Sequence, residues 1–208
     1  MAQVISVILA AGKGTRMKSK MPKVLHQVCG EPMLAHVVRA ASEAGVNKSF
    51  VVIGHEAELV KDAMGQSAEY VLQSVQLGTG HAVMQAEPFL KDFTGSIIVL
   101  CGDTPLITSE TINQIIQNHL NSGCAGTVLT ADMDDPTGYG RVVRDKSGEV
   151  QEIVEHKDAL PDQLAIREIN TGIYCFSAPK LFSGLKEVTP ANVQGEYYLT
   201  DVLAIMKR

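Results

Sequence analysis

The chain has 208 residues and a formal net charge of -5, and 45% of its residues are hydrophobic. This length can bury a sizeable core, and we expect a single domain over residues 1–208. The acidic balance argues against a general binder of nucleic acid or of anionic membranes, which would carry an excess of basic residues. No apolar run approaches the roughly 18 residues that a membrane-spanning helix needs.

The cysteines and the N-terminus favour a cytoplasmic location. Cys29, Cys101, Cys124 and Cys175 are scattered without a CxxC pair, so neither a zinc knuckle nor a redox motif is indicated. Reduced thiols of this kind are typical of cytoplasmic proteins. The apolar N-terminal stretch has no basic residue ahead of it and is a poor match to a signal peptide.

The first part of the chain alternates strand-like with helix-like segments. Apolar runs typical of buried strands lie at 4–10, 49–54, 69–73, 96–103 and 125–133. Segments with helical spacing lie between them, at 32–45, 56–65, 81–90 and 109–123. This order predicts a mostly parallel sheet with helices on both faces.

The pattern changes in the second half. Two apolar–polar stretches flank a DKSG turn within residues 140–156 and predict a hairpin. A further strand is expected at 168–177 and a last helix at 199–208. We therefore expect an α/β domain with a Rossmann-like, mostly parallel sheet that is elaborated by antiparallel strands in its second half.

The most specialised loops of the sequence follow the predicted strands. They read AAGKGTR, VLQ leading into LGTG, CGDTP, and DDPTGYGR. Ligands of open α/β sheets bind beyond the carboxyl ends of the strands. The loops therefore predict a binding site at that edge of the sheet.

The turn after the first strand is rich in glycine but fits neither common phosphate-binding motif. A dinucleotide fingerprint needs glycine where Met17 stands, and a P-loop needs serine or threonine where Gly14 stands. Backbone N–H groups of a glycine-rich turn can nevertheless approach phosphates closely.

The same turn concentrates positive charge. Five cations lie within eleven residues: Lys13, Arg16, Lys18, Lys20 and Lys23. Arg16 could bind a phosphate with its bidentate fork, and Lys23 could act as a point charge. The alternative is a strand–helix turn with incidental surface lysines.

Asp103, in VLCGDTPL at the end of a predicted buried strand, is the best candidate for a metal ligand. Mg²⁺ prefers carboxylate oxygens together with phosphate oxygens and water. The alternative role for Asp103 is to cap the turn before Pro105.

Together these motifs resemble the signature of the sugar-1-phosphate nucleotidylyltransferases. LAAGKGTRM and PKVLH are followed, in order, by VLQ with LGTGHA, GDTPL, DDPTGYGR, VEHKDA, EINTG and GEYYLTD. The resemblance covers essentially the whole chain. It is closest to the N-terminal uridylyltransferase domain of the bacterial bifunctional N-acetylglucosamine-1-phosphate uridylyltransferase/glucosamine-1-phosphate acetyltransferase family, and it implies the nucleotide-diphospho-sugar transferase fold.

The resemblance implies a Mg²⁺-assisted reaction of UTP with N-acetylglucosamine 1-phosphate that yields UDP-N-acetylglucosamine and pyrophosphate for cell-wall synthesis. The second pKa of a phosphate monoester is near 6, so the sugar phosphate is already largely dianionic at neutral pH and needs no general base. The difficulty is electrostatic, because an anion must meet a polyanion in line. Catalysis should therefore come from positioning and charge neutralisation.

The resemblance also assigns residues to parts of the site. Arg16 and Lys23 are implied to be catalytic and to bind phosphates, and Asp103 to bind the metal. The implied nucleotide-binding residues are Leu9, Ala10, Ala11, Gly12, Gly14, Gln73, Gly78 and Thr79. Of these, Gln73, Gly78 and Thr79 match positions that read the uracil, whose edge a glutamine amide suits because it can both donate and accept. Those implied to surround the sugar are Gly140, Glu155, Asn170, Tyr198 and Thr200. From the residues alone, Glu155 and Asn170 could equally be strand residues that face solvent.

The end of the chain departs from the family pattern. In the family an asparagine close to the end of the domain shares the metal, whereas this chain ends at Arg208, and Asn192 does not match that motif. We expect a C-terminally shortened nucleotidylyltransferase domain, monomeric and without the acetyltransferase β-helix. Three alternatives stay open: glucose 1-phosphate as substrate, CTP with another phosphorylated alcohol, and a binding module without turnover.

Overall fold

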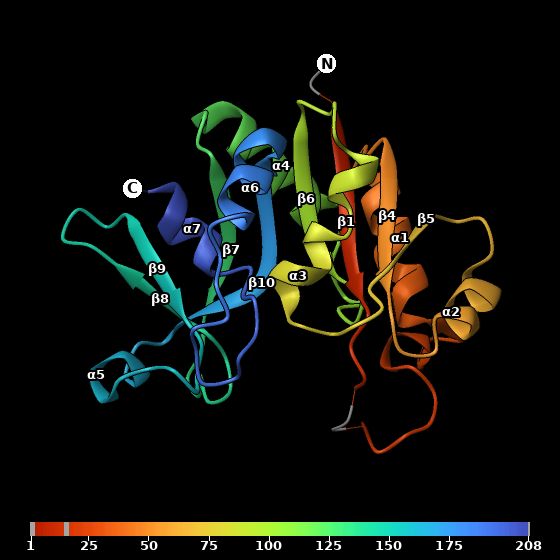
Figure 1. The fold of residues 1–208 in the computed structure, drawn as a ribbon, viewed down its shortest axis with the longest axis horizontal. Coiled ribbons are helices and arrows are strands. Elements are labelled where there is room, and N and C mark those ends of the chain that lie inside the picture. The colour runs from red at the N-terminus through yellow and green to blue at the C-terminus, as the bar shows by residue number, and fades with distance from the viewer. Residues whose placement is uncertain (1–2, 15–16, 208) are drawn as a thin grey trace.

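The computed structural model describes residues 3–14 and 17–207, and its core is one large mixed sheet (Figure 1). Four parallel strands form one half of this sheet, in the order β5 (Glu69–Leu72), β4 (Lys48–Ile53), β1 (Val4–Ala10) and β6 (Ser96–Cys101). The other half contains β7 (Gly126–Asp132), β8 (Arg141–Arg144), β9 (Val150–Val154) and β10 (Glu168–Ser177). A separate small sheet pairs β2 (Gln27–Val28) with β3 (Glu31–Pro32).

Strand β10 joins the two halves of the sheet. It pairs antiparallel with β6 along one edge and antiparallel with β7 along the other, so β7 runs in the same direction as the parallel strands without touching them. Figure 1 shows β10 lying between β6 and β7. The expected mostly parallel sheet with an antiparallel elaboration is confirmed. The sequence pattern did not show that β10 inserts between β6 and β7.

Helices cover both faces of the sheet. One face packs against α1 (Met33–Glu43), α2 (Ala57–Met64) and α4 (Ser109–Ser122), and the other against α3 (Thr79–Met84), α6 (Ala178–Leu185) and α7 (Asp201–Met206). Figure 1 shows α3 and α6 in front of the sheet and α4 behind it. Successive side chains of β1 enter opposite cores, as Val7 packs on the α3 side and Ile8 on the α1 side. No helix of the described residues is long and apolar enough to cross a membrane.

The helices differ from the sequence-based expectation in two places. The segment 81–90 is not one helix, since α3 ends at Met84 and a separate 3-10 turn, Glu87–Phe89, follows. Pro88 lacks the N–H that would continue an α-helix. Helix α6 was not expected at all, although Pro179 lies in its first turn, where proline is tolerated.

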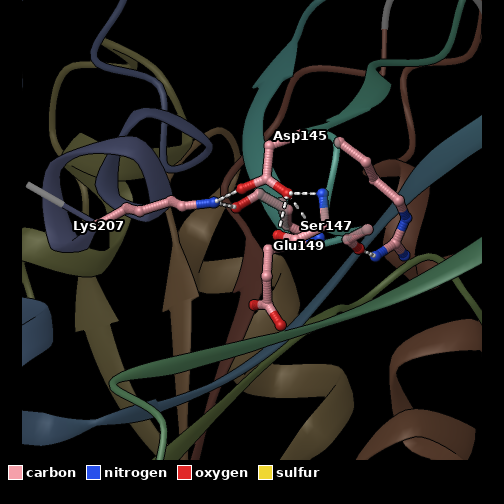
Figure 2. A network of polar contacts seen from close by, with 7 residues as sticks. Asp145, Ser147, Glu149 and Lys207 are labelled. Carbon is pink, nitrogen blue, oxygen red and sulfur yellow. Dashed lines mark hydrogen bonds and ion pairs between the residues drawn. The ribbon is translucent and has the colours of Figure 1, made fainter.

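The predicted hairpin forms and is attached to the C-terminal helix. Its turn is stabilised by Asp145, whose Oδ1 accepts hydrogen bonds from the backbone of Ser147 (2.9 Å) and Glu149 (3.1 Å). Figure 2 shows Lys207, just after α7, donating to the other oxygen of Asp145 at 2.6 Å. Lys207 therefore ties the hairpin to the end of α7.

Candidate active site

The predicted loops after β1, β5 and β6 meet at one edge of the sheet, together with the residues that follow β4. Backbone hydrogen bonds join them, from Gly102 N to Leu9 O (2.9 Å), from Gln73 N to Ile53 O (2.8 Å) and from His55 N to Ala11 O (3.5 Å). In Figure 1 this is the lower edge, where the loop after β1 extends below the sheet. The structure thus brings the glycine-rich turn, the LGTG segment and Asp103 to one place.

The start of the glycine-rich turn offers its backbone rather than its side chains. The methyl groups of Ala10 and Ala11 are buried in the cores, with 4% and 5% of each residue exposed. A Cβ atom on Gly12 would meet no other atom within 4 Å, so the space beside it is open. A ligand at this turn would therefore contact the main chain.

Gly14 is required where it lies. Its φ of +58° is in the left-handed region, and a Cβ atom there would come within 2.7 Å of Lys23 Cβ. The missing side chain therefore lets the lysine stem approach the turn. Arg16, the other predicted phosphate-binding residue, lies outside the described residues.

Lys23 and Asp103 form an ion pair across the predicted phosphate site. Lys23 starts a short 3-10 helix, Lys23–Leu25, whose Val24 and Leu25 are buried, and Asp103 follows β6. The two side chains keep 40% and 29% of their area exposed, so both remain accessible from solvent. The predicted phosphate-binding residue and the predicted metal ligand therefore lie in direct contact.

Cys101, the last residue of β6, does not compete as a ligand or nucleophile. Burial, followed by the negative charge of Asp103, raises the pKa of the Cys101 thiol to about 12. Because only the thiolate is nucleophilic and binds metals well, the side chain is inert at neutral pH. Its Sγ instead donates to Gly172 O (3.5 Å) and links β6 to β10.

Gln73 is almost fully buried behind the LGTG segment, with 2% of its area exposed. Its Nε2 donates to Gly78 O (3.2 Å) and lies 2.9 Å from His81 Nδ1. Both amide hydrogens are therefore used inside the chain, which leaves the side-chain oxygen as the group free to accept from a base. Of the donor and the acceptor that the sequence analysis expects this amide to offer, the structure leaves the acceptor available.

The LGTG segment packs against the backbone of the EYYLT segment. Gly78 has a φ of +110°, and a Cβ atom on it would lie 2.6 Å from Tyr197 O. Gly80 N donates to that same oxygen (2.8 Å), while the Thr79 hydroxyl accepts from Leu199 N (3.1 Å). The hydroxyl of Thr79 thus holds the two segments together.

Three of the residues predicted to surround the sugar lie together beside β10. A Cβ atom on Gly140 would lie 3.5 Å from Asn170 Cβ and 3.5 Å from Glu155 Oε1. Asn170 Oδ1 accepts from Gly172 N (3.0 Å) and from the Tyr174 hydroxyl (2.9 Å). The orientation that these donors require leaves the Asn170 Nδ2 group to donate to a ligand.

The two remaining predicted sugar residues, Tyr198 and Thr200, are buried, with 7% and 3% of their areas exposed. The Tyr198 hydroxyl donates to Asp158 Oδ2 (3.2 Å) and accepts from Gln194 Nε2 (2.7 Å), so its single hydrogen is already used. Thr200 Oγ1 is buried and has no partner among the described residues. An unsatisfied buried hydroxyl is costly, and a ligand or a water molecule that bonded to it would remove that cost.

Glu155 is held in an unfavourable environment for a charged group. Burial, followed by the negative charges of Asp158, Asp201 and Glu196, raises its pKa. Ionisation therefore costs folding free energy at pH values above the unfolded-state pKa, and this cost disappears when the carboxyl is protonated in both states.

The raised pKa of Glu155 leads to a prediction for the stability of Glu155→Gln. The variant should have a higher melting temperature than the wild type at about pH 8, and the difference should vanish at about pH 3, where Glu155 is protonated in both states. Thermal denaturation at a series of pH values measures it. A variant that is less stable than the wild type at pH 8 would contradict this account of Glu155.

Two contributions were not anticipated from the sequence. Asp158 lies within the VEHKDA motif, but no feature of that motif distinguishes it from its neighbours. Nothing in the sequence points to the main chain of Tyr197. Both act through hydrogen bonds between distant segments, which no local spacing reveals. Among the described residues, one hollow of about 370 Å³ lies beside α1 and one of about 450 Å³ beside β7, and neither is lined by a predicted site residue.

Comparison with known proteins decides the family. The family model described as nucleotidyl transferase matches residues 5–206. The chain belongs to the nucleotidyl transferase family. This match covers every predicted site residue, from Leu9 to Thr200.

The chain is also similar to part of a group of longer proteins. It is 58% identical over 207 residues to the bifunctional protein GlmU of Geobacillus thermodenitrificans, covering 100% of this chain and 45% of that protein. It is 55% identical to the bifunctional protein GlmU of Bacillus cereus, with the same coverage. The chain thus spans about half the length of these curated relatives.

Solved structures show the same fold at much lower identity. A UDP-glucose pyrophosphorylase complexed with UDP-glucose superposes with a TM-score of 0.80 at 20% identity, covering 100% of this chain and 88% of that one. A putative glucose-1-phosphate thymidylyltransferase from Bacillus anthracis has a TM-score of 0.79 at 24% identity, with coverages of 99% and 83%. These two likenesses confirm the expected fold.

Proposed function

We propose that the protein transfers UMP from UTP to N-acetylglucosamine 1-phosphate, giving UDP-N-acetylglucosamine and pyrophosphate. The observation that carries the proposal is the Lys23–Asp103 ion pair, which lies at the carboxyl ends of the parallel strands. The 58% identity to a bifunctional protein GlmU over the whole chain supports the same assignment.

In this reaction a phosphate oxygen of the sugar phosphate attacks the α-phosphorus of UTP. A new P–O bond forms as the bond from the α-phosphorus to its bridging oxygen breaks, and pyrophosphate leaves with the electron pair. The attacking phosphate needs no general base, because it is largely dianionic at neutral pH. The chain must align two anions and neutralise the charge that develops on the leaving group.

The described residues divide these tasks among separate segments. The turn at Gly12 offers backbone to the nucleotide, and Gln73 offers one acceptor to the base. Lys23 supplies a positive charge to the phosphates. Glu155 and Asn170 offer an acceptor and a donor to sugar hydroxyls or to an acetamido group. No titrating base is needed for any of these contributions.

The donor set fits Mg²⁺ and not a metal that needs a protein cage. Among the described residues no three His, Cys, Asp or Glu side chains gather in a metal-binding group, and Asp103 offers a partly exposed carboxylate beside Lys23. Mg²⁺ commonly takes one or two carboxylates and completes its shell with phosphate oxygens and water. Bound there, it would neutralise charge on the triphosphate. We include a cytoplasmic location in the proposal, since all four cysteines are free thiols.

The experiment that tests the function measures pyrophosphate release from purified protein with UTP, N-acetylglucosamine 1-phosphate and Mg²⁺, leaving out each component in turn. Release that requires all three is expected. Glucose 1-phosphate and CTP serve as competing substrates, and equal rates with either would overturn the assigned specificity. A folded sample that binds UTP and UDP-N-acetylglucosamine without releasing pyrophosphate would identify a binding module instead.

A further inference from the structure

Two sequence motifs, VEHKDA and GEYYLTD, form one hydrogen-bonded unit at the proposed sugar subsite. We propose that Asp158 is a positioning residue for the sugar, and that it acts through Tyr198. The inference rests on the proposed function, because it assumes that the subsite beside Glu155 receives the sugar of a nucleotide sugar.

The contacts of Asp158 carry the first step of the argument. Its Oδ1 accepts from Val193 N at 2.8 Å, and its Oδ2 accepts from the Tyr198 hydroxyl at 3.2 Å. Its own N–H donates to Glu155 O at 2.9 Å, which closes the turn that carries the Glu155 side chain. One aspartate therefore joins the Glu155 turn to two points of the 193–198 segment.

A second pair of contacts closes the connection into a ring. Gln194 donates to the Tyr198 hydroxyl at 2.7 Å, and its Oε1 accepts from Lys157 Nζ at 2.8 Å. Since Lys157 and Asp158 are neighbours in the chain, the ring has two independent links between the same two segments. Each link limits how far the Glu155 turn can shift away from the 193–198 segment.

The opposite side of the same segment holds the predicted base-binding loop. Tyr197 N donates to Leu77 O (2.8 Å), and Tyr197 O accepts from Gly80 N (2.8 Å). Adjacent residues thus contact different parts of the site. The Tyr198 hydroxyl contacts the segment on the sugar side, and the main chain of Tyr197 contacts the loop on the base side. Residues 197–199 therefore lie between the sugar side and the base side of the site. Substitutions can perturb the contacts on each side separately.

The contact between Tyr198 and Asp158 is partly buried. Tyr198 packs with 7% of its area exposed, and burial raises the pKa of its hydroxyl to about 12. The hydroxyl therefore stays protonated and keeps donating at any physiological pH. Because its only hydrogen is committed to Asp158, Tyr198 serves the sugar through placement of its neighbours.

The test separates sugar binding from nucleotide binding. Isothermal titration calorimetry with UDP-N-acetylglucosamine and with UDP is carried out on the wild type, on Tyr198→Phe and on Asp158→Asn. We expect the Kd for UDP-N-acetylglucosamine to rise about tenfold in each variant, the usual effect of one lost hydrogen bond, while the Kd for UDP changes less than about twofold. Asp162→Asn, on exposed helix α5 (Pro161–Leu164), is the matched control and should change neither value.

A double variant gives the second readout. If Asp158 acts through Tyr198, Tyr198→Phe/Asp158→Asn should bind UDP-N-acetylglucosamine no more than about twofold more weakly than the worse single variant. Fully multiplicative losses would overturn the assignment of one shared role. Equal losses for UDP and for UDP-N-acetylglucosamine would also overturn it, since they would mean a general structural role.

The outcomes also distinguish this inference from the proposed function. Wild-type protein that binds UDP-N-acetylglucosamine but releases no pyrophosphate would refute turnover and leave the positioning role testable by binding alone. If Asp158→Asn does not fold, Tyr198→Phe still decides the question, because it removes one oxygen and keeps the buried ring. An unchanged Kd for UDP-N-acetylglucosamine in folded Tyr198→Phe would refute the positioning role.

Discussion

Lys23→Ala is expected to slow pyrophosphate release by about 10²- to 10³-fold, the cost of losing one preorganised charge that stabilises a transition state. The loss should fall mainly on kcat, because the charge of the leaving pyrophosphate grows only as the reaction proceeds. Steady-state rates with saturating UTP and sugar phosphate measure the effect.

The structure indicates that this loss would not come from unfolding. Lys23 is 40% exposed and, among the residues that the structure describes, forms its ion pair with Asp103, which is itself partly exposed; such ion pairs contribute little to stability. The melting temperature should therefore change little. Lys180→Ala, at an exposed position of α6, is the matched control for loss of one lysine charge and should keep the wild-type rate. Wild-type turnover by Lys23→Ala would remove Lys23 from the phosphate site.

Lys23→Arg separates the effect of the positive charge of Lys23 from the effect of the shape of its head group. Lys23→Arg keeps the positive charge and the stem that packs against Gly14, but it replaces the compact ammonium group beside Asp103 with a wider, planar head group. If charge alone matters, this variant should recover much of the rate. Recovery of less than a tenth of the wild-type rate would show that the compact ammonium group is required.

The sequence located the strands and the edge of the sheet that carries the site, because buried strands are continuous apolar runs and their carboxyl ends must meet. It did not reveal that β10 lies between β6 and β7. Strand neighbours are chosen by long-range pairing, and an apolar run such as 168–177 has the same pattern wherever it inserts. The hairpin at 140–156 was easier to predict, since its turn residues and its partner strands are adjacent in the chain.

The sequence predicted which residues belong to the site, but not which residues they contact within the chain. Lys23 and Asp103 were assigned to different ligands, whereas in the structure they contact each other. Gln73 and Tyr198 were assigned to the base and the sugar, and the structure shows that their hydrogens are committed to the chain's own Gly78, His81 and Asp158. Such commitments arise from segments far apart in sequence, so residue spacing cannot show them.

Asp103→Asn should have two effects. It should raise the Mg²⁺ concentration that the reaction needs, and it should tighten the binding of UTP when metal is absent. The Mg²⁺ concentration for half-maximal rate is expected to rise about tenfold or more, because the neutral amide is a poorer ligand for a hard cation than a carboxylate. Titration of the rate with Mg²⁺ measures this first effect. Asp62→Asn, exposed on α2, is the control for removal of one carboxylate and should leave the titration unchanged.

The second effect follows from the ion pair. In the wild type Lys23 is partly neutralised by Asp103, and a triphosphate must compete with that carboxylate for the ammonium group. Removing the charge of Asp103 frees Lys23, so UTP should bind several-fold more tightly to Asp103→Asn than to the wild type in the presence of EDTA. A variant that simply misfolds would lose both responses. Opposite changes in metal response and in metal-free UTP affinity are therefore the specific signature of an aspartate that holds the metal and restrains the lysine, and parallel losses would contradict it.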